Sequence, residues 1–381
     1  MTVVDVRDHD APIAVGEDSP TEERMRPRAL RPLDVALFAG SLVAGGALSW
    51  LVFFRLTPMG GGLGFVLGWW VGFVFIYRTV VHRHLGRQAA TDRVMAVVVG
   101  SAAFSLFVPL VLILFFVAQK GIVALNRGFF TETLEFTGPL SAADEGGALH
   151  AIVGTLQQVG IAVVCSVPLG VMTAVYLNEV RGRLRRPLRA VVEAMSGVPS
   201  IVAGLFVYAM IVANRGSIPV IGTIVSWLPF AGRFSGVAAG LALSVLMLPT
   251  VTRTAEEMLR LVPGGLREAS LALGAPEWRT ALRVVLPTAR VGLVTAVILG
   301  VARAVGETAP LLLTAFGSAS LEMNPLEEQS SLPLFVYQQI RSPEQAQIDR
   351  AWTGALVLIL MVLVLFSVAR LIGARSKIAR R

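Results

Sequence analysis

Eight apolar blocks, each close to the length of a membrane-spanning helix, alternate with polar stretches along this chain. They lie at 35–54, 63–81, 94–118, 151–177, 191–213, 234–250, 289–316 and 351–373. Because a helix needs about 20 apolar residues to cross the hydrocarbon core of a bilayer, each block predicts one span. A closed β-barrel would show shorter segments of alternating hydrophobicity. We therefore expect an all-α integral membrane protein with about eight transmembrane helices.

The composition agrees with a membrane protein and argues against a nucleic-acid-binding one. Of the 381 residues, 55% are hydrophobic and only 15% are charged, which is more apolar than ordinary globular domains. The formal net charge is +8, but the basic residues lie between apolar blocks and do not gather on one soluble face among aromatic residues. We expect contacts with membrane lipid, including anionic head groups, and no nucleic-acid partner.

The distribution of Lys and Arg predicts the orientation of the spans. With the amino terminus inside, the cytoplasmic segments receive 25 of these residues and the outer loops receive seven. Because cytoplasmic loops of membrane proteins are enriched in positive charge, both the N- and the C-terminus are predicted to be cytoplasmic.

Three regions differ in composition. Residues 1–33 are rich in Asp, Glu, Arg and Pro, so we expect a disordered cytoplasmic tail and not a secretory signal peptide. Residues 34–93 hold the first two apolar blocks and end at a basic turn; we interpret them as an accessory two-helix membrane hairpin. Residues 94–381 hold the other six blocks and carry the functional signals.

Nothing in the sequence indicates a metal site. The single cysteine, Cys165, lies inside an apolar block and is interpreted as a small core residue. His82 and His84 adjoin arginines in a predicted cytoplasmic turn without a carboxylate-rich segment nearby. We interpret both histidines as solvated loop residues and predict no metal ligands.

The longest cytoplasmic connection, 252–288, has the pattern of a compact elbow. Glu268 and the Ala and Leu residues after it favour a helix whose positive end suits Glu268, and Gly274 interrupts that helix. Trp278 and the leucine one turn later restore an apolar stripe before Pro287 ends the turn. The pattern predicts two short helices around a glycine, with an exposed apolar face that needs a partner.

This elbow resembles the EAA motif of ABC-importer permeases, in which Glu-Ala-Ala, a glycine and a final Leu-Pro recur at fixed spacing. Here a serine replaces the second alanine, and Val284 replaces an isoleucine. The resemblance implies an ABC-importer permease domain over 94–381, and it implies that the elbow docks on a separate ATPase subunit. The residues that it assigns to ATPase coupling are Glu268, Ala269, Ser270, Gly274, Leu286 and Pro287.

ATP hydrolysis is expected in a partner chain. A phosphate-cradling loop of an ATPase requires a Gly-Lys pair, and the two lysines of this sequence, Lys120 and Lys377, follow Gln and Ser. We therefore predict that this chain is not an enzyme and holds no cofactor, and that ATP and Mg are bound by the partner ATPase.

Two charged residues lie inside the seventh apolar block. Arg303 and Glu307 stand four residues apart in apolar surroundings, and such charges are costly in a membrane and mark functional sites by default. On one helical face they can pair, which would lower the cost of insertion; a purely structural ion pair is the alternative. An arginine fork also binds phosphate oxygens in a bidentate manner. We therefore predict a substrate pathway here, and Pro199 and Ser200 can open a bend near it.

The segment ARAVGETAPLLLTA around Arg303 closely resembles phosphate-transport permeases of the PstA type. So do SGVPSIVAGLFVY, LPTVTRTAEEMLRLVP and the elbow, over roughly residues 94–381. The resemblance implies that Arg303 serves anion passage, with Glu307 as its acidic companion. It also matches Arg253 to a family arginine, although anchoring at the cytoplasmic end of the sixth span explains Arg253 equally well.

The resemblance implies the permease subunit of an ATP-driven phosphate importer in the bacterial cytoplasmic (inner) membrane. Its expected partners are a PstC-type sister permease, a PstB-type ATPase dimer, a PstS-type phosphate-binding protein and phosphate itself. One alternative is an importer permease for another oxyanion, sulfate or molybdate, because the elbow does not select the substrate. A second is an intramembrane enzyme. It is disfavoured because no histidine base adjoins Cys165 within the spans, and the charged residues singled out inside them are Glu193, Arg303 and Glu307.

Overall fold

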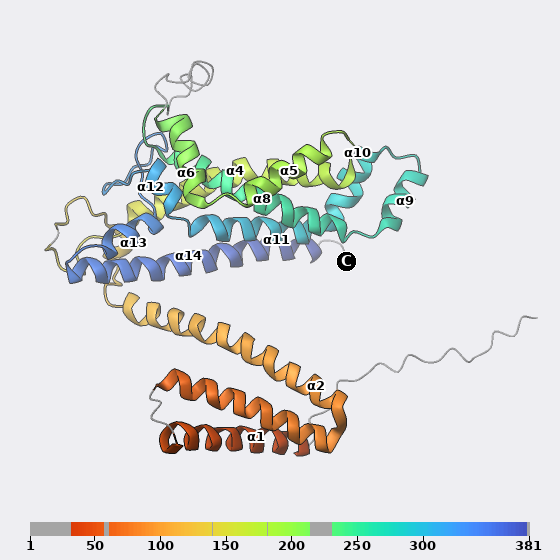
Figure 1. Cartoon of the computed structure of the whole chain (residues 1–381). Coiled ribbons are helices and arrows are strands. Elements are labelled where there is room, and N and C mark those ends of the chain that lie inside the picture. The colour runs from red at the N-terminus through yellow and green to blue at the C-terminus, as the bar shows by residue number, and fades with distance from the viewer. Residues whose placement is uncertain (1–31, 57–60, 139, 181, 214–230, 379–381) are drawn as a thin grey trace, which may run out of the picture. The chain divides into compact units, whose positions relative to one another are not determined.

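The computed structural model describes residues 32–56, 61–138, 140–180, 182–213 and 231–378. They form two compact units with a boundary between Leu110 and Val111 (Figure 1). Each unit is described by itself below. The predicted division into a tail, a hairpin ending at residue 93 and a six-helix domain stays a prediction.

The all-α class is confirmed for the described residues, which contain one isolated bridge between Phe316 and Gln329 and no strand. Three short π-helical segments, η1 (Val52–Leu56), η2 (Tyr208–Val212) and η3 (Ala281–Val285), interrupt or extend the α-helices. The α-helices are α1 (Pro32–Leu51), α2 (Gly62–Gly121), α3 (Gly128–Thr131), α4 (Leu149–Glu179), α5 (Arg185–Ser196), α6 (Ser200–Val207), α8 (Gly236–Arg260), α9 (Gly264–Ala272), α10 (Glu277–Thr280), α11 (Leu286–Val305), α12 (Ala309–Thr314), α13 (Leu332–Ile340) and α14 (Gln345–Ile378).

Six of the described helices are long and apolar enough to cross a membrane, and the bent pair of α5 with α6 and η2 would make a seventh. Helix α2 has 60 residues and consists of two helices joined at Gly86, where φ is 84° and ψ is 172°. At a rise of about 1.5 Å per residue, it is far longer than one bilayer crossing. Two of the predicted spans therefore lie in α2, and the count of eight stays a prediction.

Two of the apolar blocks form broken helices. The bend expected at Pro199 and Ser200 is present, because α5 and the helix that begins at Ser200 meet at 108°. The seventh block contains α11, which ends at Val305, and the short helix α12, which begins at Ala309. Residues 306–308 thus separate two helices where a single span was predicted.

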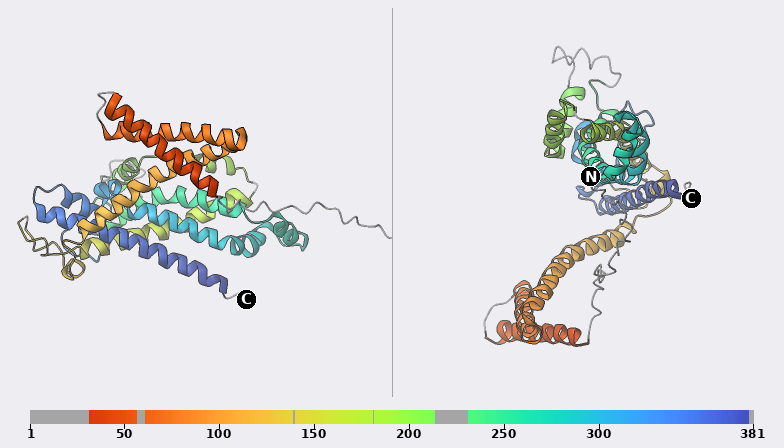
Figure 2. Two further views of the ribbon diagram at one scale, coloured as in Figure 1. Left: turned by 90° about the horizontal axis from the view of Figure 1, so that it is seen from below. Right: turned by 90° about the vertical axis from the view of Figure 1, so that its right-hand side faces the viewer.

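In unit 2, small residues let the long helices pack closely. Helices α4, α8, α11 and α14 run side by side in Figures 1 and 2. A Cβ added at Gly170 of α4 would lie 3.0 Å from Val251 of α8, and one added at Gly300 of α11 would lie 2.7 Å from the same valine. Close approach at glycines is the usual means by which membrane helices associate. Helix α8 is consequently the central and most buried of the candidate spans.

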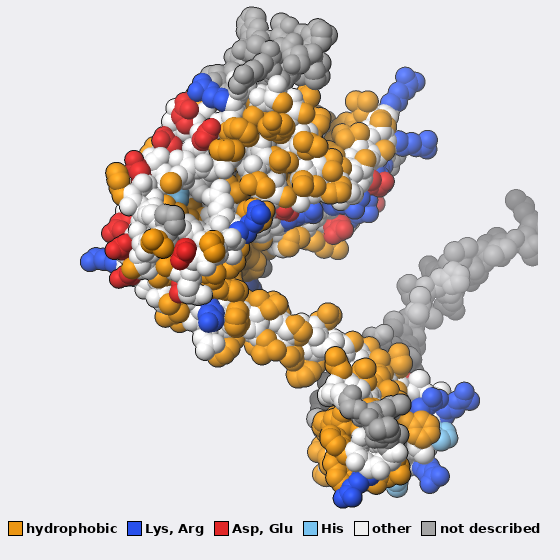
Figure 3. Space-filling model, turned by 60° about the vertical axis from the view of Figure 1, so that its left-hand side comes forward, with side chains coloured by type: hydrophobic (Ala, Val, Ile, Leu, Met, Phe, Trp, Pro, Cys, Tyr) orange, Lys and Arg blue, Asp and Glu red, His pale blue; other side chains and the backbone are white. Residues whose placement is uncertain are grey.

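The surface of unit 2 is apolar along the helices and charged at the two ends (Figure 3). Exposed leucine, valine and phenylalanine side chains cover the long helices, as a lipid-facing surface requires. In Figure 3, acidic side chains gather at the end that carries α12 and α13, while Lys and Arg side chains project at the end that carries α9. We call these the acidic end and the elbow end.

Unit 1 pairs α1 with the first part of α2. The Trp69 indole donates a hydrogen bond to the carbonyl of Leu42 at 2.9 Å, and a Cβ at Gly45 would lie 2.6 Å from the backbone of Phe73. Arg93 forms an ion pair with Asp34 at 2.7 Å. These contacts give unit 1 its own small core around Phe73.

Candidate functional site

The predicted elbow of two short helices around a glycine is present. Helix α9 ends just before Gly274, whose φ of 80° lies in the left-handed region, and residues with a side chain rarely adopt that conformation. Helix α10 follows and continues through η3. The hydroxyls of Ser270 and Thr280 lie 2.8 Å apart and hold the two arms together. We call residues 264–285 the elbow.

Two details of the predicted elbow are wrong. Helix α9 begins at Gly264, directly after Pro263, so Glu268 lies in its second turn and not at its positive end. Pro287 does not end the turn, because Leu286 and Pro287 open α11, which follows η3 without a break. Proline lacks an N–H, so it fits the first turn of a helix, where that donor is unpaired anyway.

The predicted apolar face of the elbow is exposed. Leu273 is 89% exposed, Trp278 60% and Leu282 54%, and α9 has no buried residue. The other motif residues follow the same trend, with Glu268 and Ala269 exposed and Ser270, Leu286 and Pro287 half-buried. Large apolar side chains grouped at one end of a helical bundle mark a surface that another protein covers.

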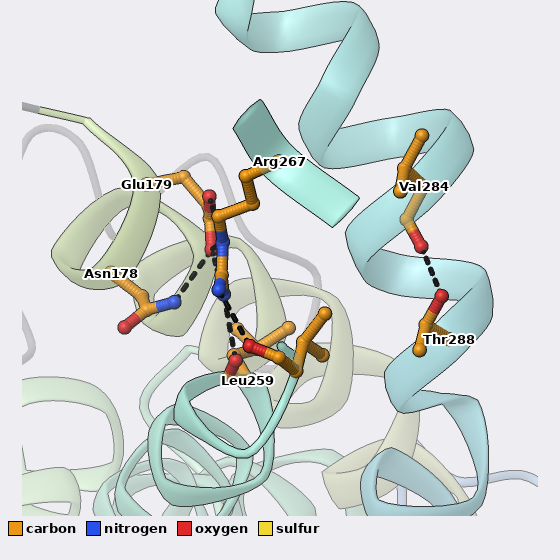
Figure 4. A network of polar contacts seen from close by, with 7 residues as sticks. Asn178, Glu179, Leu259, Arg267, Val284 and Thr288 are labelled. Carbon is orange, nitrogen blue, oxygen red and sulfur yellow. Dashed lines mark hydrogen bonds and ion pairs between the residues drawn. The ribbon is translucent and has the colours of Figure 1, made fainter. Parts of the chain in front are cut away.

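A charged network joins α9 of the elbow to α4 (Figure 4). The Arg267 guanidinium binds the Glu179 carboxylate in a bidentate manner, with Nε 3.1 Å from Oε2 and Nη2 2.9 Å from Oε1. It also donates to the carbonyls of Leu259 at 2.8 Å and Val262 at 2.7 Å. Glu179 accepts a further hydrogen bond from the Asn178 amide at 2.6 Å. Sequence reasoning missed this network because Arg267 and Glu179 are 88 residues apart.

The predicted ion pair between Arg303 and Glu307 on one helical face is wrong. Helix α11 ends at Val305, so Glu307 lies in the break before α12. The structure describes both residues, and no ion pair joins them. Arg303 is exposed, and its Nη1 donates to the hydroxyl of Thr250 on α8 at 3.2 Å. The structure therefore places an accessible guanidinium between α11 and α8, close to the helix break.

Arg253 lies one turn from Thr250 on α8, nearer the elbow end. It lines a polar cavity of about 360 Å³ with Arg189, Glu256 and Arg260; Leu177, Val192, Glu193 and Glu257 complete the lining. Residues three apart on a helix share a face, so Arg253 and the Arg303 contact at Thr250 lie along the same side of α8. The structure thus brings the two predicted pathway arginines to one side of α8.

Glu256 is a buried charge that sequence reasoning missed. It is only 9% exposed, and its Oε1 accepts hydrogen bonds from Arg189 of α5 and, at 2.5 Å, from Arg260 one turn along α8. Two cations around one carboxylate offset the cost of its burial. The i, i+4 spacing of Glu256 and Arg260 was visible in the sequence and is the signal that could have found this pair.

Residues 166–378 match the family described as binding-protein-dependent transport system inner membrane components. The chain belongs to this family. It is therefore an inner membrane component of a transport system.

Named relatives are similar over most of their length. The chain is 44% identical over 258 residues to phosphate transport system permease protein PstA 1 of Mycobacterium tuberculosis (strain CDC 1551 / Oshkosh). This alignment covers 67% of the present chain and 79% of the relative. It is 37% identical over 262 residues to phosphate transport system permease protein PstA of Xylella fastidiosa (strain 9a5c). This second alignment covers 68% of the present chain and 84% of the relative.

A solved structure shares the fold. The crystal structure of a bacterial alginate ABC transporter, in complex with an alginate pentasaccharide-bound periplasmic protein, aligns with a TM-score of 0.51 at 13% sequence identity. The alignment covers 72% of this chain and 94% of the solved chain. This likeness extends the ABC-transporter permease fold to the present chain and says nothing of its substrate.

Proposed function

We propose that this chain is the phosphate-selective permease subunit of an ATP-driven importer. The observation that carries the substrate assignment is the 44% identity to a protein named as a phosphate transport system permease. The geometry supports the transport role, because an accessible guanidinium at Arg303 lies beside a broken helix in a membrane bundle. A planar fork of N–H donors is suited to a tetrahedral oxyanion.

The elbow is the proposed docking surface for the ATPase, and its end of unit 2 faces the cytoplasm. Basic side chains project at the elbow end (Figure 3), and positive charge favours the cytoplasmic side of a membrane. Trp278 and Leu273 offer the exposed apolar anchors that a groove of a PstB-type ATPase dimer would bury. ATP and Mg belong to that ATPase, and this chain contributes no hydrolytic residue.

The acidic end supports delivery of phosphate by a binding protein. Free phosphate approaching the acidic side chains at this end is repelled at long range. A PstS-type protein would instead carry the anion past these charges and release it into a path shared with a PstC-type sister permease. Inside that path, Arg303 and then Arg253, which lie along one side of α8, would offer successive positive charges.

The substrate assignment is tested by uptake of labelled phosphate in cells that assemble the complete complex. We expect uptake that excess sulfate or molybdate does not reduce. Efficient competition by either oxyanion would replace phosphate with that oxyanion as the substrate. A complex that hydrolyses ATP without importing any of the three would contradict the importer assignment for oxyanions altogether.

The role of Arg303 is tested by Arg303→Gln in the same complex. Because glutamine removes the charge and the guanidinium fork but keeps a polar side chain, we expect phosphate uptake to be lost while membrane insertion and association with the ATPase are retained. The matched control is Arg83→Gln, since Arg83 is an exposed arginine of unit 1, outside the elbow and the acidic end. Normal uptake by Arg303→Gln would show that this guanidinium has a structural role only.

A further inference from the structure

Helix α9, the first arm of the elbow, is held to the membrane helices by the side-chain hydrogen bonds of one residue, Arg267, whereas the second arm runs directly into α11. Helix α9 has no buried residue and packs mainly on η3 and α10, which are parts of the elbow itself. Among the described residues, the side-chain hydrogen bonds that join α9 to helices outside the elbow all come from Arg267. Apart from the short connection 261–263 to α8, the polar contacts that orient α9 on the membrane helices therefore depend on one guanidinium.

The contacts of Arg267 reach two different membrane helices. Its bidentate partner Glu179 is the last residue of α4, and only 10% of the Glu179 side chain is exposed. Its other partners are the carbonyl of Leu259, in the last turn of α8, and the carbonyl of Val262, two residues beyond α8. Arg267 therefore links α9 to α4 and to the end of α8 at a single point (Figure 4).

The linked helices lead directly to the predicted pathway. Leu259 and Thr250 are nine positions apart on α8, which corresponds to about 14 Å along a straight helix. Thr250 accepts the hydrogen bond from Arg303. Helices α4 and α8 are packed closely along their length, for example where Gly240 meets Ile161. Because a packed helix pair moves as a rigid body, a displacement at its end reaches Thr250.

We infer that Arg267, through its bidentate pair with Glu179 and its bonds to the end of α8, is the positioning residue that transmits movement of the elbow to α4 and α8. This inference rests on the proposed function, in which an ATPase moves the elbow. Arg267 touches neither the substrate pathway nor the exposed apolar face of Leu273 and Trp278. Its loss should therefore uncouple transport from ATP hydrolysis without releasing the ATPase.

The test compares ATP hydrolysis with phosphate uptake in proteoliposomes that contain the complete complex and its binding protein. For Arg267→Gln and for Glu179→Gln, we expect ATP hydrolysis to continue and the phosphate imported per ATP to fall at least about fivefold, the lower range of allosteric coupling. For Arg267→Lys the ratio of phosphate to ATP should lie between those of these variants and the unmodified protein. A lysine keeps the charge, but its single nitrogen cannot reproduce the bidentate carboxylate pair together with both carbonyl bonds. Arg83→Gln, at an exposed arginine of unit 1, is the matched control and should keep the original ratio of phosphate to ATP.

A double variant separates the pair from two independent effects. If Arg267 and Glu179 act as one unit, the combined Arg267→Gln and Glu179→Gln variant should lose no more coupling than Arg267→Gln alone. An unchanged ratio of phosphate to ATP in Arg267→Gln would overturn the inference. So would loss of the ATPase from the purified Arg267→Gln complex, since Arg267 would then act in docking.

A second readout does not depend on which anion is transported. In a Cys165→Ser background, a cysteine at the exposed Gly306 reports access to the helix break through its rate of thiol labelling. We expect addition of ATP to change this rate in the otherwise unmodified complex and to leave it unchanged with Arg267→Gln. An ATP-dependent change that persists in Arg267→Gln would overturn the inference. Failure of phosphate uptake with this response intact would contradict the proposed function alone.

Discussion

The left-handed conformation of Gly274 makes a quantitative prediction about ATPase docking. At a φ of 80° an L-residue pays about 1–2 kcal/mol, and a Cβ at this position would meet no atom within 4 Å. The cost of Gly274→Ala is therefore purely conformational. If the ATPase binds only the conformation with Gly274 in the left-handed region, this cost lowers the fraction of molecules in that conformation. The affinity for the ATPase then falls about 5- to 30-fold.

The assay is titration of the reconstituted permease pair with the fluorescently labelled ATPase, which yields a Kd for each variant. Gly274→Asn should weaken binding less than Gly274→Ala, because asparagine tolerates the left-handed region better. Gly265→Ala is the matched control, since a Cβ at Gly265 also meets nothing within 4 Å but its backbone is helical. The reasoning is refuted if Gly274→Ala binds as tightly as the unmodified protein, or if Gly265→Ala weakens binding equally.

Two further predictions concern the apolar face and the close packing of broken helices. Trp278→Ser should weaken the binding free energy of the ATPase by about 2 kcal/mol or more, as for an aromatic interface anchor, and so reduce the ATPase that co-purifies. Phe136→Ser, at a residue 93% exposed outside the elbow, should not reduce it. Gly204→Ala should lower the midpoint of thermal unfolding in detergent by an amount equivalent to about 1–3 kcal/mol, because the new Cβ would lie 2.5 Å from the Pro310 backbone. Gly160→Ala, where a Cβ meets nothing within 4 Å, should not lower that midpoint, because alanine favours a helix more than glycine does; equal effects of the two glycine variants would contradict the packing argument.

The elbow was predictable because its signals are local. A glycine between two short runs of helix-forming residues is visible in the sequence, and the structure places Gly274 at the left-handed position between α9 and α10. The exposed face was predictable for the same reason, since Trp278 and Leu282 stand at helical spacing in a polar connection. The exact start of α9 was missed because Pro263, which sets it, carries less weight in a pattern than the acidic residue Glu268.

The charged contacts were predictable only where their partners are close in the sequence. Arg303 was found as an unusual charge, but its partner Thr250 is 53 residues away and an ordinary hydroxyl residue. The prediction that Glu307 pairs with Arg303 was wrong, because Gly306 ends one helix and Pro310 lies at the start of another. Arg267 and Glu179 were missed because each looks like a normal loop-end charge until the fold places them together.

The break between α11 and α12 has a consequence for the surroundings of Arg303. A helix end leaves carbonyls of its last turn without partners farther along the helix. Here the Ala304 carbonyl accepts a hydrogen bond from the backbone N–H of Glu307, and hydrocarbon offers no donor to any carbonyl left over. A lipid tail therefore cannot be the permanent neighbour of residues 302–308. Water or the polar face of another subunit must border them. The end of α11 therefore fixes how deep in the membrane polar groups must surround this protein.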